Sequence, residues 1–286
     1  MIDPCTKPCY MRGCKNMIRI HENKKYCFEI DKSASLTCFL NPFINSMGRR
    51  FRTAVIICPG GGYSQIEERE ADPVGIRFMG YGFQAFVLRY SLNQMAWPNA
   101  LLELAEAVHL IREKADVWDI DPNRVVILGF SAGGHLAATL GTQWKIIGEK
   151  WEYDCRPNAL GLVYPVISAG KWQHRESIDH LKQGTKCDYL SSIEKISYSI
   201  DQCDLSNFPS CFLVHNSDDT SVSAMNSVIL LQTLIANKAN CEMHMFHLGG
   251  HGLSLGDNMT ARIESDINER YSKWLELFVS WLDEVL

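Results

Sequence analysis

The chain has 286 residues, of which 46% are hydrophobic and 21% charged, with a formal net charge of -5 at pH 7. This composition is ordinary for a soluble globular protein, and the length suffices to bury a large core without disulfides or a metal. The negative charge argues against nucleic acid as the main partner, and no apolar run reaches the roughly 18 residues of a membrane helix.

The first part of the chain, residues 1–20, predicts a flexible tail. It has no apolar stretch of signal-peptide type, so we expect a cytoplasmic protein with reduced thiols. The chain has 11 cysteines. The spacing of Cys5, Cys9 and Cys14 matches no zinc-binding pattern, so no metal site is expected there. Other cysteines lie in apolar runs, where a free thiol behaves as a small buried hydrophobe.

The rest of the chain, residues 21–286, predicts a single α/β domain. Residues 21–52 are typical of antiparallel strands that precede the main sheet. From about residue 53, continuous apolar runs alternate with helix-like stretches, as in a mostly parallel, doubly wound sheet that is covered on both faces. The predicted parallel strands span residues 53–59, 83–90, 124–130, 159–165, 210–215 and 241–246.

Three stretches between and after these strands have apolar residues at helical spacing, namely 100–114, 223–238 and 271–286. Asn99 is expected to cap the first of these helices, because an asparagine side chain accepts hydrogen bonds from free N–H groups of a first helical turn. The polar, irregular segment 168–207 lies between two predicted strands, so we expect it to form a small cap inserted into the domain.

A short motif, Gly129-Phe130-Ser131-Ala132-Gly133, directly follows a predicted strand and opens a helix-like stretch of small residues. The Gly-x-Ser-x-Gly pattern alone is weak evidence, because chance gives about one match in ten chains of this length. Its context is that of a nucleophile elbow, in which glycines allow a tight turn and the serine lies at the positive end of a helix. Ser131 is therefore the predicted nucleophile of a serine hydrolase.

An acid and a histidine follow Ser131 in the chain order that such hydrolases use. Asp218 and Asp219 follow the predicted strand 210–215, and His251 follows strand 241–246 in a glycine-rich loop. A serine hydroxyl is a poor nucleophile without a base, and sites in open α/β sheets form at the carboxyl ends of strands. We therefore predict His251 as the base, oriented by one of the two aspartates; Asp218 competes with Asp219 for this role.

Acyl transfer also needs hydrogen-bond donors for the oxyanion. The backbone N–H of Ala132 is one predicted donor, and the glycine-rich loop 58–63 offers others. This loop lacks the lysine and the spacing of a nucleotide-binding P-loop. Tyr63, in the same loop, and Trp172, in the predicted cap, are the residues expected to contact a substrate.

The motifs in this order resemble esterases of the α/β-hydrolase superfamily, and most closely the acetyl esterase and acetylxylan esterase-like branch. The resemblance covers residues 53–282, nearly the whole chain after its first fifty residues. Similar esterases of the hormone-sensitive-lipase type carry histidine where this chain has Pro59. The motifs that carry the resemblance are PGGGY at 59–63, LRYSL at 88–92, GFSAGGH at 129–135, DDTSV at 218–222 and HLGGHG at 247–252.

The resemblance implies roles for individual residues. In the family the acid stands three residues before a valine, which corresponds to Asp219 and Val222 here, although Ser223 replaces the usual proline. The second and third glycines of the loop correspond to Gly61 and Gly62, which would bind the oxyanion together with the N–H of the residue after the nucleophile.

The resemblance also implies a reaction. We expect hydrolysis of short-chain acyl esters, above all acetyl esters on sugars or xylo-oligosaccharides, through an acyl-enzyme on Ser131 and without cofactor or metal. The expected partner is this small ester, with no nucleic acid and no membrane, and the sequence leaves room for a homodimer.

Other functions are compatible with the same three residues. A peptidase of the prolyl-oligopeptidase type shares the elbow, but such enzymes usually carry a large N-terminal β-propeller that about fifty residues cannot form. An aryl formamidase would use the same groups on an amide. A non-catalytic binding protein on this fold would be expected to lack one of the triad residues, whereas all three are present here.

Overall fold

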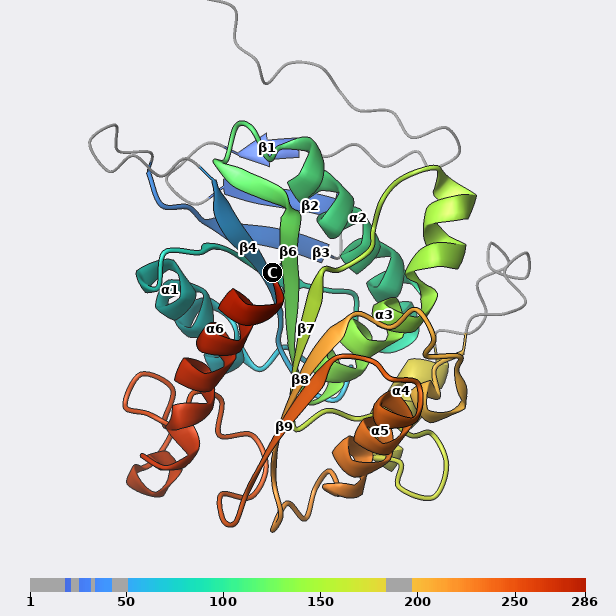
Figure 1. Cartoon of the computed structure of the whole chain (residues 1–286), viewed down its shortest axis with the longest axis vertical. Coiled ribbons are helices and arrows are strands. Elements are labelled where there is room, and N and C mark those ends of the chain that lie inside the picture. The colour runs from blue at the N-terminus through green and yellow to red at the C-terminus, as the bar shows by residue number, and fades with distance from the viewer. Residues whose placement is uncertain (1–18, 22–25, 32–33, 43–50, 184–196) are drawn as a thin grey trace, which may run out of the picture.

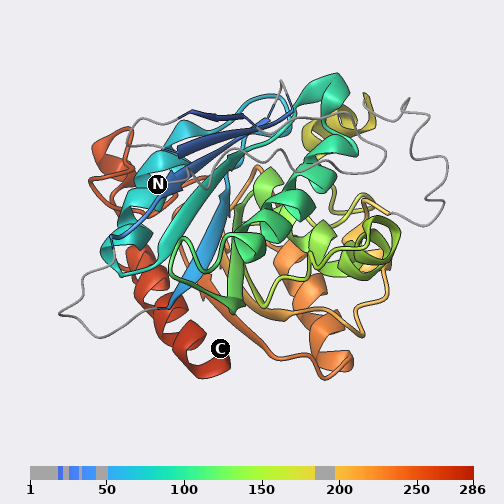
Figure 2. The same ribbon diagram turned by 90° about the horizontal axis from the view of Figure 1, so that it is seen from above.

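The computed structural model describes residues 19–21, 26–31, 34–42, 51–183 and 197–286. Within these residues, nine strands form one twisted sheet in the order β1-β2-β3-β5-β4-β6-β7-β8-β9. The sheet runs through the centre of the molecule, with helices on both faces (Figures 1 and 2). The predicted doubly wound α/β architecture, which is the α/β-hydrolase fold, is thereby confirmed.

The first three strands are antiparallel to their neighbours, and β4 to β9 are parallel to one another. The parallel strands match the predicted ones within a few residues, because β4 to β8 are apolar runs that are mostly buried on both faces. The edge strand β9 is only half-buried, and its prediction rests on its apolar residues. The strands are β1 (Arg19–His21), β2 (Tyr26–Asp31), β3 (Ala34–Phe39), β4 (Arg52–Cys58), β5 (Gln84–Arg89), β6 (Ile120–Phe130), β7 (Ala159–Val163), β8 (Ser210–Asn216) and β9 (Cys241–Phe246).

The register of the parallel strands places their carboxyl ends at one edge of the sheet. Cys58 at the end of β4 pairs with Gly129 in β6, and Phe130 pairs with Val163 at the end of β7. The loops that follow these strands therefore start at the same level, where open α/β sheets place their sites.

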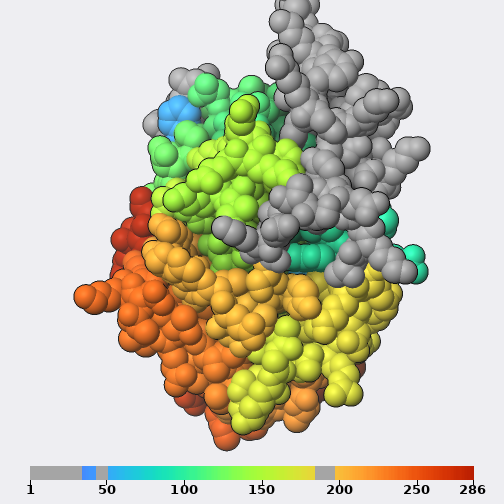
Figure 3. Space-filling model, turned by 90° about the vertical axis from the view of Figure 1, so that its right-hand side faces the viewer, coloured from blue at the N-terminus to red at the C-terminus, as the bar shows by residue number. Residues whose placement is uncertain are grey.

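Helices cover both faces of the sheet. α1 and α6 lie on one face, and α2, α3 and α5 lie on the other (Figure 1). Figure 3 shows the side that carries the second group, with the exposed surfaces of α3 in lime and of α4 in yellow. The helices are α1 (Asp72–Gly80), α2 (Asn99–Glu113), α3 (Ala132–Trp151), α4 (Arg175–Gln183), α5 (Met225–Ala236) and α6 (Trp274–Val285).

The start of α2 differs from the prediction that Asn99 caps it. Asn99 is the first helical residue, Pro98 holds the capping position, and no side chain caps the helix. The reason is that the helical hydrogen bonds begin earlier: the N–H of Ala100 already donates to the carbonyl of Ala96, and that of Leu102 donates to the carbonyl of Pro98. Asn99 therefore lies inside the first turn, where a capping side chain has no function.

The two segments with predicted special roles are only partly described. Of the predicted tail 1–20, all but the last two residues lie outside the described residues. The predicted cap 168–207 contains α4, but its residues 184–196 also lie outside them. The single domain and its cap thus stay predictions. No helix in the described ranges is long and apolar enough to cross a membrane.

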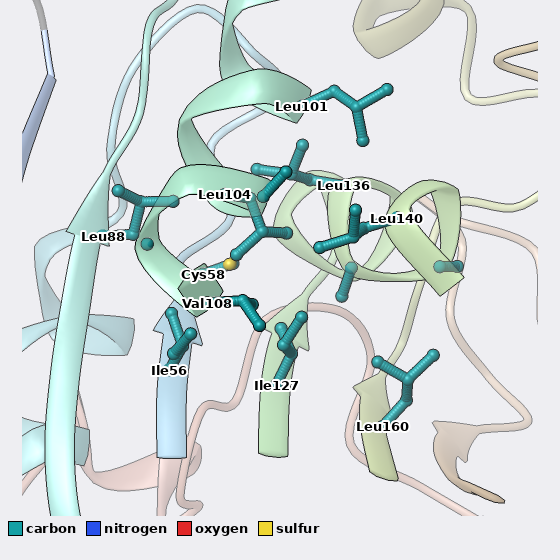
Figure 4. Close-up of a cluster of buried hydrophobic side chains, with 14 of the residues drawn as sticks. Ile56, Cys58, Leu88, Leu101, Leu104, Val108, Ile127, Leu136, Leu140 and Leu160 are labelled. Atoms are coloured by element: carbon teal, nitrogen blue, oxygen red, sulfur yellow. The ribbon is translucent and has the colours of Figure 1, made fainter. Parts of the chain in front are cut away.

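One core layer lies between the sheet and the helices α2 and α3 (Figure 4). The side chains labelled in Figure 4 come from four strands and two helices, and each of them is at most 2% exposed. The residues labelled in Figure 4 are Ile56, Cys58, Leu88, Leu101, Leu104, Val108, Ile127, Leu136, Leu140 and Leu160. On the opposite face, Phe78 of α1 meets Phe278 of α6 edge to face, with 6.1 Å between the ring centroids.

We predict that Leu104→Ala lowers the free energy of unfolding by about 2–5 kcal/mol, because a fully buried leucine leaves a cavity that its close-packed neighbours fill only in part. The matched control is Val117→Ala, since Val117 is 73% exposed; we expect it to change the free energy by less than about 0.5 kcal/mol. Urea unfolding measures both. An equal loss in the two variants would contradict this description of the core.

Candidate active site

The turn that carries Ser131 is strained and tightly packed. Ser131 lies between the end of β6 and the first residue of α3. Its backbone has φ 51° and ψ -114°, a conformation that residues other than glycine rarely adopt. A β-carbon on Gly133 would overlap the carbonyl oxygen of Cys58, and one on Gly129 would overlap the carbonyl oxygen of Gly133. The two glycines are therefore a steric requirement of the turn.

Three side chains from three different strand ends meet at this turn. Oγ of Ser131 lies 2.9 Å from Nε2 of His251, and Nδ1 of His251 lies 2.7 Å from Oδ2 of Asp219. Because a carboxylate only accepts hydrogen bonds, Nδ1 carries the proton and donates to Asp219. Nε2 is then the acceptor for the hydroxyl proton of Ser131, which is the arrangement that activates a serine.

Asp219 is held as a carboxylate by several donors. Its Oδ1 accepts the N–H groups of Ser221 and Val222, each at 2.9 Å. Burial by itself raises the pKa of Asp219, but hydrogen bonds from His215 and His251 outweigh it and hold this pKa well below its usual range. The group is thus ionised at neutral pH, as the orienting acid of a catalytic histidine must be.

A second histidine, His215, faces the same carboxylate. It is fully buried, and its Nε2 lies 3.2 Å from Oδ2 of Asp219 and 3.0 Å from the carbonyl oxygen of Val222. Both neighbours accept, so Nε2 carries the proton, while Nδ1 lies 2.7 Å from the hydroxyl of Ser227. Sequence reasoning did not single out His215; its only signal is its place at the end of β8, four residues before Asp219.

The structure distinguishes the two adjacent aspartates. The carboxylate of Asp218 accepts the N–H groups of Gly249 at 3.2 Å and Gly250 at 2.9 Å. Asp218 therefore binds the backbone just before His251, whereas Asp219 contacts the imidazole itself. The two carboxylates hold the same loop at different points, and only one of them touches the ring.

The glycine-rich loop after β4 lies directly beside Ser131, since a β-carbon on Gly60 would be 3.0 Å from Cβ of Ser131. Gly61 and Gly62 have positive φ values of 118° and 64°. Among the hydrogen bonds of the described residues, none uses their N–H groups. The N–H of Ala132 is also free of an intrahelical partner, because it opens α3. The predicted oxyanion donors are thus available next to the nucleophile.

Tyr63 does not offer a surface to a ligand, contrary to the expectation that it contacts a substrate. It is 1% exposed, and its hydroxyl donates to Nδ1 of His135 at 2.8 Å. The opposite ring nitrogen of His135 donates to the carbonyl of Tyr198 at 2.7 Å. The physical reason is that this loop turns inward after Gly62, which points the phenol into the core, where it supports the loop.

The described part of the predicted cap touches the glycine-rich loop. His180 in α4 donates through Nδ1 to the carbonyl of Gly62 at 3.0 Å. Trp172, the other expected substrate contact, is half-buried, and the ammonium group of Lys171 lies 4.5 Å from its ring centroid. The role of Trp172 stays a prediction, and His180 is a neighbour of the site that the sequence pattern did not indicate.

The chain is similar to known families and proteins. A family model described as BD-FAE matches residues 43–158, and the model of the prolyl oligopeptidase family matches residues 103–284. The crystal structure of an acetyl ester-xyloside bifunctional hydrolase from Caldicellulosiruptor lactoaceticus superposes with a TM-score of 0.74 and 30% identity, covering 88% of each chain.

Two curated relatives are longer proteins. The acetylxylan esterase of Xylanibacter ruminicola is 31% identical over 242 residues, which is 82% of this chain and 47% of the relative. The endo-1,4-beta-xylanase B of Butyrivibrio fibrisolvens is 30% identical over 216 residues, which is 72% of this chain and 33% of the relative. The chain thus spans between a third and about half of the length of these relatives.

We predict that Asp219→Asn lowers kcat roughly a thousandfold to ten-thousandfold, because an amide no longer holds the histidine in the reactive tautomer. Asp218→Asn is the matched neighbour. It keeps an oxygen that accepts from the loop backbone, so we expect a loss of about tenfold or less. Steady-state hydrolysis of p-nitrophenyl acetate measures both; a larger loss for Asp218→Asn would exchange the two roles.

We also predict that Gly133→Ala abolishes activity, because its methyl group must push the elbow away from the carbonyls of Cys58 and Pro59. Gly80→Ala is the control: a β-carbon at Gly80, the last residue of α1, meets no atom within 4 Å. We expect it to leave activity unchanged and stability unchanged or slightly higher. Full activity in Gly133→Ala would show that the turn is looser than described.

Proposed function

Since the chain belongs to the prolyl oligopeptidase family of α/β hydrolases and is acetylxylan esterase-like, we propose that it is a serine carboxylic-ester hydrolase that acts on short-chain acyl esters. Ser131 is the nucleophile, His251 the base and Asp219 the orienting acid. The observation that carries the proposal is the unbroken row of hydrogen bonds, 2.9 Å from Ser131 to His251 and 2.7 Å from His251 to Asp219. The resemblance to esterases supports the reaction class.

In the first half of the proposed reaction, Oγ of Ser131 bonds to the carbonyl carbon of the ester while its proton passes to Nε2 of His251. The carbonyl oxygen becomes an oxyanion, which accepts the N–H groups of Gly61, Gly62 and Ala132. The imidazolium then donates its proton to the alcohol oxygen as the carbon–oxygen bond breaks. The alcohol leaves, and the acyl group stays on the serine.

The second half repeats these steps with water. Water gives a proton to Nε2 of His251 as its oxygen attacks the acyl carbon, and the same donors bind the new oxyanion. The proton then returns to Oγ of Ser131 when the acyl–serine bond breaks, and the carboxylic acid leaves. These steps require no cofactor or metal, because His251 and the backbone donors supply the proton transfer and the charge stabilisation.

For the substrate we propose acetyl esters of sugars or xylo-oligosaccharides. The support comes from the names of the relatives, an acetylxylan esterase and an acetyl ester-xyloside bifunctional hydrolase. The site itself contributes a steric argument, because Ser131 is only 7% exposed. In addition, His180 is hydrogen-bonded to the carbonyl of Gly62 in the glycine-rich loop 58–63, the donor loop. A small acyl group suits this confined space better than a long chain.

A second candidate function is a prolyl-oligopeptidase-like peptidase, which the match of that family over residues 103–284 favours. The nucleophile, base and donors would be the same, and the leaving group would be an amine instead of an alcohol. An aryl formamidase would also cleave an amide with this site. The leaving group therefore separates the ester hydrolase from the two amide-cleaving candidates, and the acyl group separates the peptidase from the formamidase.

The test is a substrate panel of p-nitrophenyl acetate, butyrate and octanoate, acetylated xylo-oligosaccharides, a proline-containing peptide amide and N-formylkynurenine. We expect acetyl esters to be hydrolysed with the highest kcat/KM, and Ser131→Ala to lose at least roughly a thousandfold in kcat. Cleavage of the peptide alone would replace the ester proposal with the peptidase, and cleavage of the formamide alone with the formamidase. Unchanged turnover in Ser131→Ala would refute the nucleophile.

A further inference from the structure

A buried carboxyl group that the triad does not use lies behind the nucleophile. Glu70 ends a 3-10 turn, Glu68–Glu70, between β4 and α1, and it is 2% exposed. Its Oε2 accepts the N–H of Gly60 at 2.7 Å, and its Oε1 accepts the hydroxyl of Tyr164 at 2.7 Å. Both oxygens are therefore engaged, one with the donor loop and the other with the end of β7.

Tyr164 extends this connection to the base. It is fully buried, and its ring lies edge-on to the imidazole of His251, with 4.9 Å between the centroids. Its hydroxyl oxygen accepts the N–H of Ser254 at 2.9 Å. Since that N–H brings its own proton, the hydroxyl proton of Tyr164 points to Glu70.

Ser254 is the point where the loop of His251 is anchored. It lies three residues after His251, is fully buried and has a positive φ of 56°. Besides the bond from its N–H to Tyr164, its hydroxyl donates to the carbonyl of Arg69 at 3.1 Å. The loop that carries His251, here called the base loop, is thus bound both to the 3-10 turn, through Arg69, and to Tyr164, which Glu70 of the same turn holds.

The pKa of Glu70 is raised above its ordinary value. Burial causes the rise, and the hydrogen bonds from Tyr164 and Gly60 and the attraction of a charged His251 offset it only in part. The link between Glu70 and the site therefore rests on the two hydrogen bonds that its oxygens accept.

We propose that Glu70 is a positioning residue of the esterase reaction. One buried carboxyl group fixes the donor loop through Gly60 and the base loop through Tyr164 and Ser254, so the donors and the base keep their relative places while the proton moves. This inference rests on the proposed function, because it assigns Glu70 a part in that reaction. It predicts that the link, and not merely a filled volume, is required for turnover.

Glu103 offers a matched control, because it is equally buried, at 4% exposed, and equally bound. Its two oxygens accept the N–H and the hydroxyl of Ser91, and so connect α2 to the loop after β5. These two hydrogen bonds end on Ser91, which belongs neither to the triad nor to the donor loop. Replacing Glu103 therefore measures what the loss of a buried carboxyl group does when that group is bound to Ser91 instead of to Gly60 and Tyr164.

The experiment compares Glu70→Ala, Glu70→Gln, Tyr164→Phe, the double variant Glu70→Ala/Tyr164→Phe and Glu103→Ala. The readouts are kcat and KM for p-nitrophenyl acetate, the rate at which a fluorophosphonate labels Ser131, and the thermal midpoint. Glutamine at position 70 can accept from Gly60 through its oxygen and donate to the Tyr164 oxygen through its amide. Phenylalanine at position 164 keeps the ring against His251 and removes only the hydroxyl.

We expect Glu70→Ala and Tyr164→Phe to lower kcat and the labelling rate at least about tenfold with KM within about twofold, because small misplacements of reacting groups are costly. Glu70→Gln should recover to within about threefold of wild type. The double variant should lose no more than the worse single variant, since both act through one link. Glu103→Ala should lower the thermal midpoint without changing kcat.

Three results would overturn the inference. The first is a kcat within twofold of wild type in Tyr164→Phe and in any folded Glu70→Ala. The second is a double variant whose loss in kcat is the product of the two single losses, and the third is a loss in kcat for Glu103→Ala that equals that of Glu70→Ala. Tyr164→Phe keeps the test decisive if Glu70→Ala fails to fold. If the wild type labels at Ser131 but hydrolyses no ester, the proposed function fails, whereas the labelling rates still decide the role of Glu70.

Discussion

Gly133, in the first turn of α3, packs directly against the carbonyl oxygens of Cys58 and Pro59, where an added β-carbon would overlap both. No side chain fits between these segments, so the elbow and the donor loop are in direct contact. This contact fixes the distance between the hydroxyl of Ser131 and the N–H groups of the neighbouring loop before any substrate binds. Such preorganisation is the main source of electrostatic stabilisation in acyl transfer. The glycines are thus a requirement of the chemistry as well as of the turn.

The parallel sheet makes this contact possible and supplies the other groups. β4 leads into the donor loop, β6 into Ser131, β7 into Tyr164, β8 into Asp219 and β9 into His251. Neighbouring parallel strands end at the same level, so the five loops that follow them meet at one place although they are distant in sequence. The strands position the start of each loop, and a few hydrogen bonds, such as those of Asp218 and Ser254, hold the rest of the loop in place.

The parts of the structure that could be predicted from the sequence are those that have a local sequence pattern. Buried parallel strands appear as apolar runs, and a tight turn appears as glycines around Ser131, so the fold and the relative order of the three triad residues could be predicted. Glu70, Tyr164 and His215 could not, because each acts through a partner that is distant in sequence or through a ring nitrogen whose orientation only the packing decides. A glutamate in a charged stretch and a histidine at a strand end have no pattern of their own. The same limit explains Tyr63, whose neighbourhood in sequence indicates a substrate but whose side chain turns into the core.

The imidazole of His135 sets a limit on the conditions under which this arrangement persists. It accepts from Tyr63 through Nδ1 and donates to Tyr198 through Nε2, so it must be neutral. Burial lowers its pKa from the ordinary 6.5 to about 4. As the pH falls below about 6.5, the unfolded chain binds a proton at this position whereas the folded chain does not. The free energy of unfolding therefore decreases. The support of the donor loop is therefore intrinsically acid-sensitive, and an environment that acidifies would weaken the loop through a residue that takes no part in the proton transfer.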